Sequence, residues 1–383
     1  MDKPLDGLLV VEFAQFMAGP TAGLRLADLG AKVIKIERPV TGEMGRQIAI
    51  KNIFVDSSSL VFHTINRNKE SYAANLKDQE DLKAVKALVQ KADVLIHNFR
   101  PGVMEKFGLD YENSRKLNQR LIYAVVTGYG NKGPWANKPG QDLLVQSLSG
   151  ITWLSGRGDQ GPVPFGLAVI DMYCATHLTQ GILAGLLKRH KTREGCLVEV
   201  SLLESALDMQ FEVLTTHLND NHTLPNRSKV KGAGHAYLSA PYGVYQTKDS
   251  YLALAMGDLK KIAQLLQLTG EDFENPDSWF SKRDELLIQI GDRLAEKKTQ
   301  EIIDFLHEHG VWSSEVNDYH KFFKSEGFKS AQALQEVTLQ DGRKITTTRS
   351  PYHIDGERYF SAKAAPQVGE HTLRFNDEHL INI

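Results

Sequence analysis

The first 40 residues carry the hydrophobic pattern that most limits what this chain can fold into. Two apolar runs, GLLVVEFA at 7–14 and AKVIKIE at 31–37, have the length and β-branched content of buried strands. Between them, TAGLRLADLG at 21–30 has the pattern of a short helix that ends at a glycine. Strand, helix and strand in this order predict a parallel pair with a right-handed crossover. The pattern therefore predicts an α/β domain.

The same alternation continues to about residue 210. Leu82, Val85, Leu88 and Val89 share one face of an expected helix at 78–92. Further strands are expected at 93–99 and 120–130, a buried helix at 141–155, a helix with a basic end at 173–191, and a strand followed by a helix at 195–211.

The residue composition of the sequence changes near residue 217. The segment at 217–234 is polar and rich in turn residues, which is typical of a linker or loop. Beyond it we expect a hairpin with a Lys-Asp-Ser turn and two charged amphipathic helical stretches, at 257–268 and 284–309. The predicted domains are 1–224 (large, Rossmann-like), 225–325 (small, α+β) and 326–383 (a return to the large domain).

Composition excludes several classes of protein. The chain has 383 residues and a net charge of −2, so no strong field would hold it on nucleic acid or an anionic membrane. No apolar run reaches ~18 residues, and the N-terminus lacks the pattern of a signal peptide. The two cysteines, Cys174 and Cys196, have no metal-ligand spacing. We therefore expect a soluble cytoplasmic protein without a metal.

Motifs of the common nucleotide-binding and hydrolytic folds are missing. The first turn reads AQFMAGPTAG rather than GxGxxG, so NAD is not expected. Neither a P-loop nor a GxSxG motif occurs.

Three polar clusters lie next to expected strands. They are Arg38, the group Asn66, Arg67, Asn68 and Lys69, and the group Asn98, Phe99 and Arg100. Taken alone, Arg38 fits a solvated surface arginine better than a ligand contact. We take the three clusters to occupy equivalent topological positions, and this shared position predicts an anion site with an aromatic plate for a base.

Asp171 follows the apolar run of GLAVID and precedes a helix-like stretch. Aspartate in that position is usually an N-cap. The alternative is a carboxylate nucleophile at the end of a strand, in a pocket shaped by Asp142 or Gln141. Nearby, Cys174 and His177 fit packing roles better than catalysis.

Several of these segments together resemble the class III CoA-transferases, the group of formyl-CoA transferase and carnitine CoA-transferase. The resemblance rests on the segment from GLLVVEFA to KIERP, on NRNKES, ADVLIHNFRPGVMEKFGLDY and VTGYGNKGPW, and on the Asp171 segment. It covers residues 5–210 and resumes at APYGVYQTKDSYLALAMGD and in the tail. It implies a large Rossmann-like domain, a smaller domain, and two subunits interlocked as a homodimer. Its members move coenzyme A from an acyl-CoA donor to a carboxylic acid.

The resemblance also assigns residues. The family's catalytic aspartate falls on Asp171, which would form an aspartyl anhydride and then an aspartyl-CoA thioester. The loop KGAGHA at 231–236, with Gly232, Gly234 and His235, is the expected lid or oxyanion loop. The family's CoA-contacting positions fall on Met17, Ala18, Arg38, Ile65, Asn66, Arg67, Asn68, Asn98, Phe99, Arg100 and Lys106.

Two departures from the family leave alternatives open. The loop carries fewer glycines than in formyl-CoA transferase, and Gln141 stands where transferases often have tyrosine. Formyl or oxalate specificity is therefore in doubt, and neither the donor nor the small carboxylate acceptor is fixed. An α-methylacyl-CoA racemase would need a histidine at Gln141, and an amide cannot exchange a proton near neutral pH. A non-catalytic CoA-binding relative is the third alternative.

Overall fold

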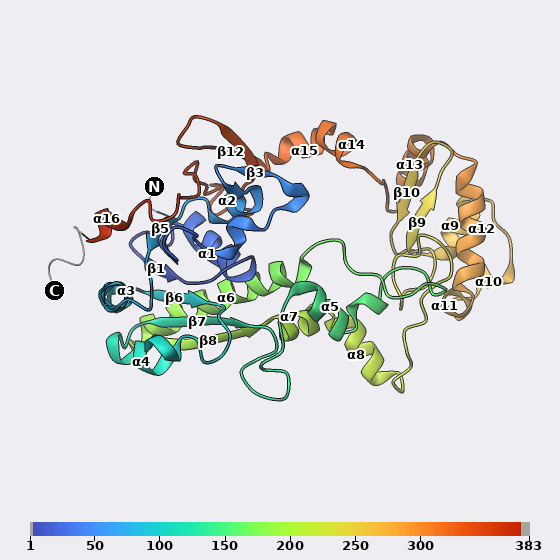
Figure 1. Ribbon diagram of the computed structural model, residues 1–383. Coiled ribbons are helices and arrows are strands. Elements are labelled where there is room, and N and C mark those ends of the chain that lie inside the picture. The colour runs from blue at the N-terminus through green and yellow to red at the C-terminus, as the bar shows by residue number, and fades with distance from the viewer. Residues whose placement is uncertain (1–2, 377–383) are drawn as a thin grey trace. The chain divides into compact units, whose positions relative to one another are not determined.

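The computed structural model describes residues 3–376, and the chain divides into two compact units. Unit 1 comprises the chain up to Val145, Ala168–Met209 and the segment from Gln332 on. Unit 2 comprises Gln146–Leu167 and Gln210–Ala331. The predicted boundaries differ from this division at three places: at 209/210 instead of 224/225, at 331/332 instead of 325/326, and in the transfer of 146–167 to unit 2. Figure 1 colours the chain from its N-terminus in blue to its C-terminus in red.

Unit 1 is built on a six-stranded parallel sheet with the order β5-β2-β1-β6-β7-β8. The direction of strand order reverses between β1 and β6, and this pair is the topological switch point where ligands bind in open α/β sheets. The predicted α/β fold with parallel strands is confirmed. The strands are β1 (Leu9–Glu12), β2 (Lys32–Glu37), β5 (Glu70–Ala73), β6 (Val94–His97), β7 (Ile122–Thr127) and β8 (Cys196–Ser201).

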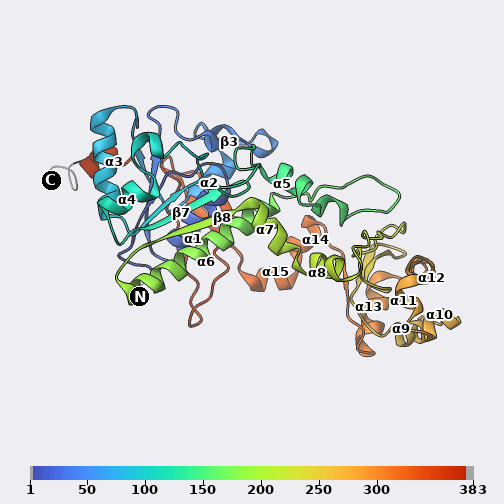
Figure 2. The same ribbon diagram turned by 90° about the horizontal axis from the view of Figure 1, so that it is seen from below.

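Helices cover both faces of this sheet. Helices α1 (Ala18–Asp28) and α6 (Val169–Thr192) pack together on one face, and α3 (Gln79–Lys91) packs with α4 (Tyr111–Leu117) on the other, as Figure 2 shows. The expected face of α3 is buried, with Val85 and Val89 both 0% exposed. A hydrophobic core therefore fills the space between α3 and the strands.

Two glycines explain how α1 lies so close to the end of β1. A Cβ on Gly19 would come within 2.3 Å of the Ala14 Cβ, and a Cβ on Gly23 within 1.8 Å of a Glu12 carboxylate oxygen. Any side chain at either position would push the helix away from the strand. Glycine at these two positions therefore allows α1 to pack closely against the end of β1.

The C-terminal segment packs onto β5 within unit 1. Phe375 is 0% exposed and lies against the ring of Tyr72, and Arg374 pairs with Glu70 at 2.6 Å. The remaining helices and strands of this unit, with α5 crossing into unit 2, are η1 (Met44–Gln47), η2 (Ile50–Asn52), β3 (Phe54–Val55), β4 (Ser58–Ser59), α2 (Leu60–Asn66), η3 (Glu105–Phe107), α5 (Asp142–Leu148), α7 (Leu202–Met209), β12 (Leu334–Thr338), β13 (Lys344–Thr348) and α16 (Thr372–Phe375).

Unit 2 combines a small antiparallel sheet with helices. The expected hairpin is confirmed as β9 (Gly243–Gln246) paired with β10 (Tyr251–Leu254), and β11 (Ser313–Glu315) adds a third strand. The stretch expected at 284–309 forms two helices, α12 (Arg283–Ala295) and α13 (Thr299–Glu308). The other helices are η4 (Ile151–Trp153), α8 (Phe211–Asn219), α9 (Leu259–Leu265), α10 (Glu271–Glu274), α11 (Ser278–Ser281), α14 (Tyr319–Lys324) and α15 (Glu326–Ala331).

One expected element is wrong. The segment at 141–155 is not a single buried helix, because α5 ends at Leu148 and Gly150 adopts a left-handed φ of 84°. Leu143 is 53% exposed and Leu144 is 42% exposed, so the apolar side chains of α5 are not core residues of this chain. Over residues 3–376, no helix is long and apolar enough to cross a membrane.

Candidate active site

Asp171 is the third residue of α6, and it neither caps a helix nor ends a strand. The N-cap is Ala168, which makes no side-chain capping bond. The N-cap and the strand end that the sequence predicts for Asp171 are therefore both wrong. Val169 and Ile170 are β-branched and apolar, as in a strand, but they already belong to the helix. Helix α6 leads into β8, so it runs back along the sheet and begins at the carboxyl edge of the strands.

The first turn of α6 is capped by a side chain from another segment. One carboxylate oxygen of Asp142 accepts hydrogen bonds from the backbone N–H groups of Ile170, at 2.8 Å, and Asp171, at 3.0 Å. Asp142 is the first residue of α5 and is 7% exposed. It therefore satisfies two N–H groups that a helix N-terminus leaves without partners, and it fixes the backbone that carries Asp171.

The surroundings of Asp171 disfavour its charge. Burial raises the pKa of the Asp171 carboxyl to about 7, and the neighbouring carboxylate of Asp142 acts in the same direction. The N-terminus of α6 acts the other way, because its dipole favours an anion. The result is a poorly solvated carboxylate that titrates near neutral pH, which is the state in which a carboxylate is most reactive toward an acyl carbonyl.

The two other reactive side chains near Asp171 are held in packing contacts, as the sequence indicates. Cys174 is 0% exposed, and burial raises the pKa of its thiol to about 12. The ring of His177 lies 3.0 Å from the Ser205 hydroxyl and 3.1 Å from the Asp208 carboxylate. The Cys174 thiol is therefore not available as a nucleophile, and both ring nitrogens of His177 are engaged by Ser205 and Asp208.

Residues predicted to bind CoA surround the switch point of the sheet. Asn98, directly after β6, accepts the N–H of Gln15 at 2.9 Å and donates to its carbonyl at 2.7 Å. This pair of bonds joins the loop after β6 to the turn after β1. Because adjacent parallel strands end at one edge, the structure brings together the following residues of the loops after β1, β2 and β6: Met17, Ala18, Arg38, Asn98, Phe99 and Arg100. Arg38, Arg100 and Lys106 are exposed, and Phe99 is half-buried.

The cluster at 66–69 lies elsewhere. It precedes β5, which is parallel to β2, so it sits at the amino edge of the sheet and not at the edge of Arg38. Arg67 is 1% exposed and pairs bidentately with Asp28 at 2.5 and 2.8 Å, and Asn66 is fully buried. The assumed equivalence of the three clusters is wrong. CoA binding by this segment stays a prediction for Ile65, Asn66, Arg67 and Asn68. The polar side chains of Arg67 and Asn68 already make hydrogen bonds within the protein.

Topology points instead to the residues after β5. The N–H of Ala74 donates to the carbonyl of Glu37 at 2.8 Å, so the 74–77 segment leaves the sheet beside Arg38. Lys77, an exposed cation of this segment, follows β5 at the edge where the 66–69 cluster was expected. The signal was present in the sequence, since NRNK comes before the apolar run SYAANL rather than after it.

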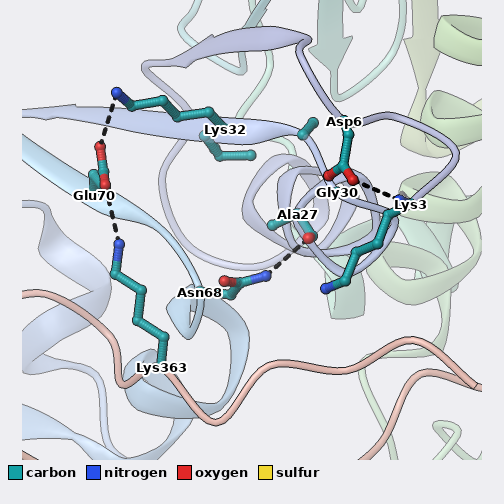
Figure 3. A pocket seen from close by; sticks show the side chains of 10 residues that line it. Lys3, Asp6, Ala27, Gly30, Lys32, Asn68, Glu70 and Lys363 are labelled. Atoms are coloured by element: carbon teal, nitrogen blue, oxygen red, sulfur yellow. Dashed lines mark hydrogen bonds and ion pairs between the residues drawn. The ribbon is translucent and has the colours of Figure 1, made fainter. Parts of the chain in front are cut away.

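A pocket of about 300 Å³ is lined by residues at the amino ends of β2 and β5, among them Lys32 and Glu70 (Figure 3). Its charged side chains are paired with each other or with backbone: Glu70 binds Lys363 at 3.1 Å and Lys32 at 3.8 Å, and Lys3 donates to the carbonyl of Phe360. Of the residues predicted to contact CoA, Asn68 lines it, and its amide donates to the Ala27 carbonyl at 2.8 Å. This pocket is separate from the site of Asp171.

The predicted oxyanion loop belongs to unit 2, and Gln141 belongs to unit 1. The N–H of Gly234 donates to the Tyr242 carbonyl at 3.2 Å, and a Cβ there would lie 2.7 Å from the Tyr242 ring. Gly232 has a φ of +89°, and His235 accepts the N–H of Tyr237 at 3.0 Å. These contacts explain the two glycines by local packing, and their oxyanion role stays a prediction. Gln141 is exposed.

No group of three or more His, Cys, Asp or Glu side chains that could hold a metal ion occurs in the part of the chain that the structure describes. The protein groups that could contact a bound molecule at the carboxyl edge are exposed cations, one half-buried aromatic ring, and a carboxyl group of raised pKa.

Comparisons with known proteins show the family of this chain. The model of CoA-transferase family III matches residues 5–372. The succinate–glutarate CoA-transferase of Agrobacterium fabrum is 31% identical over 382 residues, covering 96% of this chain and 94% of the relative. The acetyl-CoA:oxalate CoA-transferase of Acetobacter aceti is 34% identical and covers 80% of this chain and 79% of the relative.

Among solved structures, a CAIB/BAIF family protein from Brucella suis superposes with a TM-score of 0.85 at 29% identity, covering 99% of this chain and 100% of that chain. The match with the family model spans nearly the whole chain, and the curated relatives transfer coenzyme A. The chain therefore belongs to CoA-transferase family III and is an enzyme that transfers coenzyme A between an acyl-CoA and a carboxylic acid.

Proposed function

We propose that Asp171 is the nucleophile of this transfer. The observation that carries the proposal is the position of its carboxyl group at the start of α6, where burial raises its pKa. The backbone N–H of the same residue donates to Asp142. Poor solvation leaves an ionised carboxylate reactive, and the capped first turn holds it in one place.

The chemistry needs only exchange of activated acyl groups. Asp171 attacks the thioester carbonyl of the donor, forming an acyl-aspartyl anhydride and releasing CoA thiolate. The thiolate attacks the aspartyl carbonyl, which gives aspartyl-CoA thioester and frees the donor acid. The acceptor carboxylate then attacks this thioester, and the released thiolate attacks the acceptor side of the new anhydride. Acceptor-CoA leaves and the carboxylate of Asp171 is restored, with no ATP consumed.

The CoA itself is assigned to the carboxyl edge of the sheet. Arg38 and Arg100 are exposed cations directly after β2 and shortly after β6, and guanidinium groups bind phosphate bidentately. Phe99 offers a half-buried ring to the base, and Lys106 adds a further exposed cation. The start of α1, with Met17 and Ala18, contributes backbone N–H groups at the switch point.

For the acceptor we propose a small dicarboxylic acid, with succinyl-CoA as the first donor to test. The names of the relatives support this class, since they act on succinate and glutarate, on oxalate, and, in Haloarcula hispanica at 29% identity, on mesaconate. Gln141 is exposed one residue before Asp142 and is the proposed neutral contact for the acceptor.

We also propose that the enzyme is an interlocked homodimer, as its family resemblance implies. The exposed apolar side chains of α5 support an assembly, because Leu143, Leu144 and Leu148 are 53%, 42% and 44% exposed in the single chain. Light scattering on the purified protein tests this, and a monomeric mass at micromolar concentration would contradict it.

The decisive screen crosses acetyl-, succinyl- and formyl-CoA with a panel of mono- and dicarboxylates and detects new CoA esters by mass. We expect esters of dicarboxylates to form from succinyl-CoA, and Asp171→Ala to abolish them while CoA still binds. Turnover that survives in Asp171→Ala would refute the role of the nucleophile. Esters of monocarboxylates alone would refute the acceptor class.

A further inference from the structure

A cluster of ionised side chains lies buried beneath the proposed CoA site. The ammonium of Lys35, on β2, is 0% exposed and contacts the carboxylates of Glu12 at 3.0 Å and Glu43 at 3.3 Å. The ammonium of Lys69 contacts the other side of Glu12 at 2.9 Å. Two cations and two carboxylates thus balance one another away from water, which is the condition under which buried charges are tolerated.

This cluster holds the turn between β1 and α1 at two points. Lys35 donates to the carbonyl of Ala14 at 2.7 Å, and Glu43 accepts the N–H of Phe16 at 2.9 Å through its second carboxylate oxygen. The residue between them, Gln15, is bound at both its N–H and its carbonyl by Asn98. Three consecutive residues of the turn are therefore fixed by side chains from three different segments.

The turn needs such support because its backbone is strained. Phe16 has a φ of +64°, in the left-handed region that side chains other than glycine, asparagine and aspartate rarely adopt. Phe16 is 41% exposed, so packing of its side chain offsets little of the free-energy cost of this conformation. The hydrogen bond from its N–H to the buried Glu43 carboxylate, which is paired with Lys35, is the contact that opposes relaxation.

We propose that Glu43 is a positioning residue for acyl-CoA: anchored by Lys35, it holds Phe16 in the left-handed conformation from which α1 begins at the CoA site. Glu43 is 4% exposed, so its proposed effect on the ligand is indirect. Its effect reaches Met17 and Ala18, which follow Phe16 directly and form the start of α1. The inference rests on the proposed location of CoA at this edge of the sheet.

The first test compares two substitutions of Glu43. Glu43→Ala removes the acceptor for the Phe16 N–H, whereas Glu43→Gln keeps an acceptor oxygen of similar shape without the charge. We expect Glu43→Ala to raise the Kd for CoA and the KM for acyl-CoA about 10-fold with kcat within about twofold, and Glu43→Gln to recover most of the affinity. A general loss of folding would instead reduce the amount of active enzyme, so the apparent kcat would fall in both variants. Unchanged KM in a folded Glu43→Ala would overturn the proposal.

The second test isolates backbone strain. Glycine adopts a positive φ without penalty, so Phe16→Gly removes the need for the clamp. In a double-mutant cycle measured by CoA titration calorimetry, the loss caused by Glu43→Ala should shrink at least about threefold in the Phe16→Gly background. Strictly additive effects would overturn the proposal. If Glu43→Ala does not fold, Glu43→Gln takes its place in the same cycle, and the smaller loss that it causes should shrink in the same proportion in the Phe16→Gly background.

Arg38→Ala separates this inference from the proposed CoA site. If Arg38→Ala weakens CoA binding and the Glu43 variants do not, the CoA site stands and the positioning role is wrong. If Arg38→Ala and Glu43→Ala both leave CoA binding unchanged, the proposed location of CoA is wrong and the positioning role falls with it. Weakening by both, with coupling between Glu43 and Phe16, is the expected result.

Discussion

Two groups of poorly solvated carboxylates lie in the same unit of this enzyme, and they differ in how their charge is balanced. Glu12 and Glu43 meet the ammonium groups of Lys35 and Lys69 within 3.3 Å, and all of the contacting side chains are buried. At the start of α6 the Asp142 carboxylate, which accepts the backbone N–H groups of Ile170 and Asp171, lies close enough to the Asp171 carboxyl to raise its pKa. The first group consists of paired charges, and the second consists of like charges.

The difference separates structure from chemistry. In the paired group each carboxylate is held in place by an ammonium group, so these contacts serve the structure. Like charges in a poorly solvated place raise the free energy of the ionised form, which makes a carboxylate both basic and nucleophilic. The raised pKa of Asp171, about 7, is the signature of that state. The predictions below test whether the two groups behave as differently as this contrast requires.

The largest expected effect is on activity at Asp171. Asp171→Ala and Asp171→Asn should each lower kcat by ~10⁴-fold or more, because no other group can form the covalent intermediate. Steady-state assays with succinyl-CoA measure this, with Asp208→Asn as the matched control, since Asp208 contacts His177 and not the proposed site. A loss below about tenfold in Asp171→Asn would contradict covalent catalysis.

The same substitution should stabilise the fold. The folded-state pKa of Asp171 lies above its usual value, so the folded protein binds this proton more tightly than the unfolded chain, and stability is lost as pH rises from about 4 to about 7. Asp171→Asn removes that penalty and should raise the free energy of unfolding by about 1–3 kcal/mol at pH 8, with little change at pH 4. Urea titrations at the two pH values measure it, and destabilisation at pH 8 would count against a disfavoured charge.

A smaller but still large effect is expected for the paired group. Lys35→Met leaves Glu12 and Glu43 without their shared cation in a buried place, and should destabilise the fold by about 3–5 kcal/mol. The control is Lys344→Met, which breaks an exposed pair with Glu336 and should leave the free energy of unfolding nearly unchanged. Equal midpoints of urea unfolding for the two variants would show that the buried cluster is not held by charge pairing.

The smallest effect concerns Asp142. Asp142→Asn keeps an oxygen that can cap α6 but removes the like charge beside Asp171, so the pKa of Asp171 should fall. The wild-type kcat/KM should rise with pH through about 7, and in Asp142→Asn this acid limb should move to lower pH, with kcat reduced about tenfold or less. Asp142→Ala, which also loses the cap, should lose more. An acid limb that stays in place would assign the titration to another group.

Local pattern was enough to predict much of unit 1. The strands and helix of residues 9–37 could be recognised because apolar periodicity within 30 residues decides them, and the parallel sheet followed from their order. The site was less accessible. Val169 and Ile170 have strand propensity, and only the cap from Asp142, 28 and 29 positions away in sequence, shows that a helix begins there. Glu43 directly precedes the short helix η1, and its burial depends on contacts with β2 and Phe16 that no local pattern predicts.

The most direct test of the central claim follows an oxygen atom. In the proposed sequence of steps, one oxygen of the acceptor carboxylate ends in the carboxylate of Asp171 in every forward turnover. The enzyme would be cycled with succinyl-CoA and an acceptor labelled with oxygen-18, then digested, and the peptide that contains Asp171 weighed and fragmented. The account predicts oxygen-18 in the side chain of Asp171, in a reaction that depends on both substrates. Continued turnover with an unlabelled Asp171, or label on another carboxylate, would contradict it.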